Sequence, residues 1–177
     1  MGKIDQQTVQ AHVDAGNNGA TTAHQGRAFE NLICYVFEQI PGISITKRNE
    51  LNAFNTEEID VALWNDRHED GLFFLPNIIL VECKNWSKRV GSEEVNWFDS
   101  KLRNRGLNFG VLVAANGITG QARDLTAAHS IVAAALRERR RLVVIRTSEI
   151  LSLVDSDQLV RLVKEKLCEL AVGGAIT

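Results

Sequence analysis

The chain has 177 residues, of which 45% are hydrophobic and 24% charged, and its net charge is −2. This composition is typical of one soluble globular domain with a sizeable core, and it excludes a protein that attracts nucleic acid through an overall positive charge. The sequence shows no signal peptide, and no apolar run reaches the roughly 20 residues of a membrane span. A membrane protein is therefore not expected. The three cysteines show neither disulfide nor zinc spacing, so we expect a reducing, cytoplasmic location.

A run of small and polar residues separates the first segment from the first helix. Residues 1–20 are predicted to be a flexible leader, because the run 15–19 (AGNNG) interrupts any helix there. Residues 21–172 are predicted to form a single domain. Its first helix extends from about Thr22 to Gln39, with apolar residues at helical spacing, and Glu30 lies beside that stripe and could point inward.

Three strands are expected after this helix. The predicted strands are 43–48, 57–64 and 78–84. A short link joins the second and third, so we expect them to be antiparallel neighbours. Alternation along the second strand places Asp60 on the face opposite Ile59 and Val61. The pairing would bring Asp60 toward the end of the third strand.

The second half of the chain alternates helices and strands. The predicted elements are a helix over 93–105, a strand over 109–114, a helix over 121–140, a strand over 142–145 and a helical region over 148–170 that is interrupted near 155–157. Antiparallel strands followed by strand–helix–strand crossovers predict an α/β fold, with a mixed β-sheet flanked by helices.

The strand 78–84 is apolar except at its end. Glu82 and Lys84 share one face, about 7 Å apart by strand rise, and Cys83 points to the other face as a buried small hydrophobe. Because burying a charge is costly, the charged end indicates a mutual salt bridge, a strand end in solvent or a metal site. If Asp60 and Glu30 converge on the same end, the group suits metal-assisted hydrolysis: carboxylates bind Mg²⁺, and a lysine stabilises the charge on a reacting phosphate.

A helix glutamate, a strand aspartate and Glu-x-Lys on the next strand resemble the PD-(D/E)xK nuclease superfamily, most closely its Mrr-like restriction endonucleases and NERD domains. The likeness covers about residues 22–146 and implies a restriction-endonuclease-like αβββαβ core, here with an extra C-terminal strand and helix. The motif's name has proline before the aspartate; Ile59 stands there, at a position that the chemistry does not need.

The resemblance also assigns roles to the candidate residues. It implies that Asp60, Glu82 and the backbone carbonyl of Cys83 bind Mg²⁺, for which Mn²⁺ could substitute. Lys84 would position the attacking water, and Glu30 would assist directly or through a water. The implied function is a Mg²⁺-dependent endodeoxyribonuclease in a prokaryotic defence or mobile-element system, acting as a homodimer or with partner proteins that supply specificity.

Two alternatives stay open at this point: a Holliday-junction-resolvase-like nuclease, and a non-catalytic DNA-binding or assembly subunit. Four basic residues follow the proposed site, namely Lys88, Arg89, Lys101 and Arg103. They are predicted to contact DNA phosphates, although a solvated helix end accounts for them equally well. Trp86 and Trp97 could stack on bases or serve packing.

Overall fold

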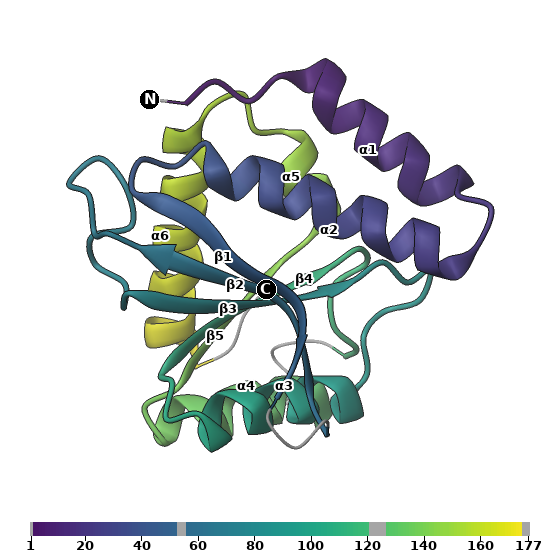
Figure 1. Ribbon diagram of the computed structural model, residues 1–177. Helices are drawn as coiled ribbons and strands as arrows, with labels where there is room; N and C mark the ends of the chain where they lie inside the picture. Colours follow the sequence, from purple (N-terminus) through teal and green to yellow (C-terminus); the bar gives the residue numbers. More distant parts are fainter. Residues whose placement is uncertain (1, 53–55, 121–126, 175–177) are drawn as a thin grey trace.

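The structure is a computed structural model that describes residues 2–52, 56–120 and 127–174. A five-stranded mixed sheet carries helices on both faces, so the predicted α/β fold is confirmed (Figure 1). In chain order the elements are α1 (Gln6–Asn18), α2 (Thr22–Glu38), β1 (Ile43–Leu51), β2 (Glu58–Asn65), β3 (Ile78–Lys84), α3 (Ser92–Asn104), β4 (Phe109–Ala114), α4 (Ala127–Arg137), β5 (Arg141–Ile145), α5 (Thr147–Leu151) and α6 (Ser156–Gly173). The start of the helix predicted over 121–140 lies outside the described residues.

The strands lie in the order β1-β2-β3-β4-β5. β2 pairs antiparallel with both β1 and β3, as expected, whereas β3, β4 and β5 run parallel and are connected through α3 and α4. Every residue of β4 is buried, because a parallel strand inside such a sheet has helices over both of its faces. Among the described residues, no helix is long and apolar enough to cross a membrane.

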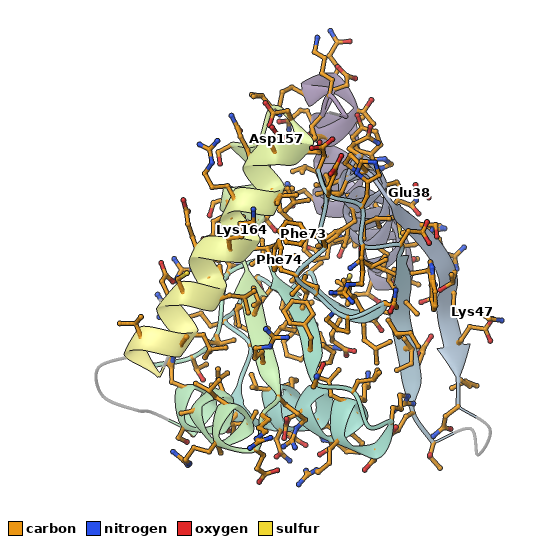
Figure 2. All side chains as sticks on the ribbon, turned by 90° about the vertical axis from the view of Figure 1, so that its left-hand side faces the viewer. Glu38, Lys47, Phe73, Phe74, Asp157 and Lys164 are labelled. Atoms are coloured by element: carbon orange, nitrogen blue, oxygen red, sulfur yellow. The ribbon has the colours of Figure 1, made fainter. Side chains whose placement is uncertain are left out.

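Each face of the sheet has its own apolar core. On one face α2 and α6 contribute Phe37 and Val163 to a single cluster, and on the other α3 and α4 contribute Phe98 and Val132 to a second. In Figure 1, α2 lies above the sheet, α3 and α4 lie below it, and α6 runs along its left side. The link between β2 and β3 is attached to α6, since the ammonium group of Lys164 lies 5.7 Å and 5.2 Å from the ring centroids of Phe73 and Phe74 (Figure 2).

The N-terminal segment differs from the flexible leader expected for residues 1–20. Residues 6–18 form α1, and Asp5 caps this helix by accepting a hydrogen bond from the backbone N–H of Thr8. Ile4 is 1% exposed, and its backbone N–H donates to the carbonyl of Val154 at 3.0 Å. Ile4 and Val9 both belong to the core beneath α2. Two isolated apolar residues among polar neighbours are too few to give a periodic signal, so the sequence did not reveal this packing.

The docking of this segment predicts a measurable contribution to stability. Ile4→Ala should lower the free energy of unfolding by about 2–5 kcal/mol, the usual cost of emptying a buried isoleucine site. Val172→Ala on α6 is the control, because that side chain is 90% exposed. Denaturant unfolding followed by circular dichroism measures both variants. Equal stability of Ile4→Ala and the parent would show that the segment does not pack against the core.

Candidate active site

The candidate site forms where β2 and β3 stop pairing. Their ladder extends from Trp64 opposite Ile78 to Val61 opposite Val81. One step further, the backbone N–H of Cys83 donates to the Oδ2 atom of Asp60 at 2.7 Å. A side-chain carboxylate thus takes the place of a backbone acceptor, and the two strands part at this point.

The side chains of β2 also change faces here, which corrects the simple alternation expected from the sequence. Val61 and Leu63 pack in the core under α2, but Ile59 packs in the core under α3 and α4. The pairing of β1 with β2 continues through this region without a shift, from Arg48 opposite Val61 to Glu50 opposite Ile59. The β1–β2 hairpin therefore twists as a unit and curves toward α3 (Figure 1), which leaves the Asp60 carboxylate beside β3.

Glu82 is the most enclosed member of the site. It is 5% exposed, and its Oε1 atom lies 2.8 Å from the Nζ atom of Lys84. Its Oε2 atom lies 2.7 Å from the Nζ atom of Lys101 on α3. The mutual salt bridge between Glu82 and Lys84, one of the three alternatives for this strand end, is therefore present, and a second lysine contacts the same carboxylate.

Lys101 is the residue whose position the sequence did not indicate. It was expected with the surface cations that contact DNA, but it is 8% exposed and bonded to Glu82. On α3 it lies between Phe98 and Leu102, two residues of the apolar stripe, and this placement at the edge of the stripe is the signal that could have shown that it faces the sheet. The α3 helix is itself fixed by a buried ion pair, in which the guanidinium of Arg140 contacts Asp99 at 2.7 and 2.9 Å.

The charges at the site perturb one another. Burial, followed by the negative charge of Glu82, raises the pKa of Asp60 to about 6. Burial by itself would lower the pKa of Lys84, but the charge of Glu82 and its hydrogen bond outweigh this effect, so the pKa of the ammonium group is raised. Lys84 therefore carries a proton at neutral pH and acts as a cation and hydrogen-bond donor, not as a base.

Glu30 lies apart from the contacts that join Asp60, Glu82 and Lys84. Its Oε2 atom accepts a hydrogen bond from the side chain of Asn49 at 3.0 Å and lies 3.6 Å from the guanidinium of Arg48. Asn49 and Arg48 both lie on β1. Cys83 packs on the α2 side of the sheet, as predicted. Burial and then the charges of Asp60, Glu30 and Glu82 raise the pKa of its thiol, so it is not a ready nucleophile.

The other predicted basic residues remain on the surface. Lys88, Arg89 and Arg103 are exposed, whereas Lys101 is buried. Three of the four predicted basic residues are therefore accessible to a DNA phosphate. The Nζ atoms of Lys84 and Lys88 lie 5.9 Å and 5.3 Å from the centre of the Trp86 ring. Trp86 therefore links Lys84, the half-buried cation of the site, to the exposed Lys88 on the following loop.

A cavity of about 270 Å³ opens onto the site. Its lining residues are Thr56, Glu57, Glu58, Glu82, Lys84, Glu94, Trp97 and Lys101. A larger cavity of about 770 Å³ lies between α1, α2, α5 and the loop 85–88, and its lining includes none of Asp60, Glu82 and Lys84. The smaller cavity is therefore the one that leads to the candidate chemistry.

The residues at the site fit a divalent cation. Within the described part of the chain no group of three or more His, Cys, Asp or Glu side chains is placed to hold a metal ion by itself. A cation here would have as donors the carboxylates of Asp60 and Glu82 together with a backbone group. The N–H and the C=O of any one strand residue point toward the same neighbouring strand. Because the N–H of Cys83 donates to Asp60 on β2, the carbonyl of Cys83 also points toward β2. A cation would offset the burial and the charge of Glu82, which in that order raise the pKa of Asp60.

Comparison with known families assigns most of the chain to one of them. The sequence profile of the Mrr catalytic domain, described as a restriction endonuclease, matches residues 21–163. The chain belongs to this family. The matched range contains Glu30, Asp60, Glu82 and Lys84, and the expected membership of the PD-(D/E)xK group is confirmed. Comparison with curated proteins gives no match.

Membership in the family has two consequences. A DNA nuclease function is implied at the level of the family, and restriction endonucleases of this kind are typically metal-dependent. The Mrr-type match leaves α1 outside its range.

The raised pKa of Asp60 predicts a pH-dependent effect on stability in the presence of EDTA. The carboxyl binds its proton more tightly in the folded chain, so ionisation opposes folding as pH rises from 3.8 to about 6, and the penalty is complete above that range. Asp60→Asn should therefore raise the free energy of unfolding at pH 8 by up to about 3 kcal/mol and change it little below about pH 4.

Unfolding by urea at both pH values measures this difference, with Glu58→Gln as the control because Glu58 is exposed on the same strand. A loss of stability in Asp60→Asn that is the same at both pH values would contradict the burial of a charged Asp60 beside Glu82.

Proposed function

We propose that this chain is a Mg²⁺-dependent endodeoxyribonuclease that hydrolyses DNA phosphodiester bonds by in-line attack of water. The observation that carries the proposal is the junction of β2 and β3, where the Asp60 carboxylate accepts the Cys83 N–H beside a Glu82 held by two lysines. These are the residue types and strand positions on which the chemistry of the PD-(D/E)xK family depends, and the family match includes them.

Asp60, Glu82 and the Cys83 carbonyl are the groups that would hold Mg²⁺ or Mn²⁺. The bound ion would supply Lewis acidity to a phosphate oxygen and an acidified water. Asp60 must be ionised to take part, so metal affinity should fall below about pH 6. Glu82 already accepts one lysine on each oxygen, and each carboxylate oxygen has a further lone pair for another partner.

Lys84 donates hydrogen bonds from the floor of the cavity, where it can orient the attacking water or a phosphate oxygen and stabilise negative charge that develops in the reaction. Its raised pKa keeps it protonated for that purpose. Glu30 would act indirectly, because its carboxylate is engaged by Asn49 and Arg48. Such an arrangement fixes the β1–β2 hairpin that carries Asp60.

The charge balance of the site explains how a chain with a net charge of −2 could bind DNA. The carboxylates of Asp60 and Glu82 are matched by the ammonium groups of Lys84 and Lys101, so these four groups together are close to neutral. A divalent cation would make it positive and attract a phosphate. The exposed cations Lys88, Arg89 and Arg103 are proposed to hold neighbouring phosphates.

The described residues hold one such centre, so cutting both strands of a duplex requires two chains or two successive events. We therefore retain a homodimer, with partner proteins as a source of specificity, and a prokaryotic defence or mobile-element context as parts of the proposal. A junction-resolving nuclease would use the same centre, and a non-catalytic DNA-binding subunit would use its surface alone.

Plasmid cleavage with Mg²⁺ or Mn²⁺ tests the proposal. The parent should nick supercoiled DNA, whereas Asp60→Ala and Lys84→Ala should be slower by about 100-fold or more, because each removes a group that acts on the reacting phosphate. Glu165→Ala is the matched control, since Glu165 is an exposed carboxylate on α6 that does not line the cavity. EDTA should abolish all cleavage.

Nicking at equal rates in all four proteins would overturn the assignment of the centre. Parallel reactions on a linear duplex and a four-way junction separate the two nuclease candidates, because a resolvase cuts the junction selectively. A parent that binds DNA in Mg²⁺ and leaves it intact would favour the non-catalytic alternative.

A further inference from the structure

The cavity over the site contains an exposed tryptophan that the fold does not use. Trp97 is 53% exposed and lines the same cavity as Glu82, Lys84 and Lys101. Its neighbour on α3, Phe98, is 1% exposed and belongs to the core. Phe98 and its buried neighbours thus pack α3 against the sheet. The exposed part of the Trp97 indole is available to a ligand in the cavity.

The placement of Trp97 relative to the lysines follows from the helix. Glu94, Trp97 and Lys101 are spaced by three and four residues on α3, so they form one stripe along the helix surface. Lys101 ends this stripe on Glu82, and Trp97 stands one turn away, about 6 Å along the axis by helix rise. Any group bound at the lysines therefore has the indole ring as its neighbour.

The lining of the cavity carries charges of both signs. Lys84 and Lys101 line it and contact the carboxylate of Glu82, and Glu58 and Glu94 add further carboxylates. Glu57 also lines the cavity, but its carboxylate is paired with Arg105. The lysines attract a phosphate and the carboxylates of Glu58 and Glu94 repel one, so the neighbour that fits beside the indole is an uncharged base.

We propose that Trp97 stacks on an unpaired base next to the phosphate that is cut, so that the preferred substrates are single strands, flaps and gaps rather than intact duplex. Within a duplex both faces of a base are covered by its neighbours, and exposing one of them costs unstacking energy. A base without a neighbour offers its face freely, and stacking on an aromatic side chain tolerates every sequence. The inference rests on the proposed nuclease function and assigns its substrate class.

Two assays on matched variants test the stacking. Fluorescence anisotropy in Mg²⁺ measures binding of a labelled single strand and of the blunt duplex of the same sequence, and single-turnover cleavage is followed on both. The proteins are the parent, Trp97→Ala, Trp97→Phe and Trp64→Ala. Trp64 is the control because it is 41% exposed and pairs with Ile78, away from the point where β2 and β3 part.

Trp97→Ala should weaken binding and cleavage of the single strand roughly tenfold, the loss expected for one stacked base, while its effect on the duplex stays below twofold. Trp97→Phe should keep most of the parent's activity on the single strand, and Trp64→Ala all of it. A loss in Trp97→Ala that is equal on both substrates, or shared by Trp64→Ala, would overturn the proposal.

The binding assay separates this inference from the nuclease proposal. If the parent cuts neither substrate but binds the single strand tenfold better than Trp97→Ala does, stacking stands and the nuclease assignment fails. If the parent cuts DNA and Trp97→Ala cuts the single strand equally well, the nuclease assignment stands and stacking fails. A parent that does not bind the single strand overturns the stacking.

Discussion

The repulsion between two carboxylates in a gap of the sheet is the constraint on which this site depends. Asp60 and Glu82 are brought together by neighbouring strands, and burial with the charge of Glu82 raises the pKa of Asp60 to about 6. Every strong contact nearby compensates for that arrangement: the Cys83 N–H on Asp60, and the ammonium groups of Lys84 and Lys101 on Glu82. The charges of these four side chains balance, and a bound cation, as we propose, would offset the burial and the charge of Glu82 that raise the pKa of Asp60.

The remainder of the fold holds these groups in place. The twist of the β1–β2 hairpin turns Ile59 into the α3 core and leaves the Asp60 carboxylate beside β3. The buried ion pair between Asp99 and Arg140 fixes the helix that carries Lys101. On the far face, α2 and α6 cover the sheet, so the backbone around Cys83 is supported from behind.

The sequence was a good guide to the central strand and a poor one to its surroundings. The apolar run that ends in Glu82 and Lys84 is a local pattern, and the antiparallel partner of that strand follows from a short link, so both could be predicted. The face change at Ile59 could not, because it arises where Asp60 replaces a backbone acceptor, a contact between residues 23 positions apart. The same holds for Lys101, whose partner Glu82 lies 19 positions earlier, and for Ile4, whose burial depends on a segment far along the chain.

Calorimetric titration of the chain with Mg²⁺ tests the central claim most directly, because it asks for the cation without requiring DNA or turnover. At pH 7.5 the parent should bind Mg²⁺ at a single site, and the affinity should fall toward pH 5 as Asp60 takes up its proton. Asp60→Asn should show no such binding, and Glu165→Gln, which changes an exposed carboxylate on α6, should match the parent. Equal Mg²⁺ binding by the parent and Asp60→Asn at both pH values would contradict a metal site between β2 and β3.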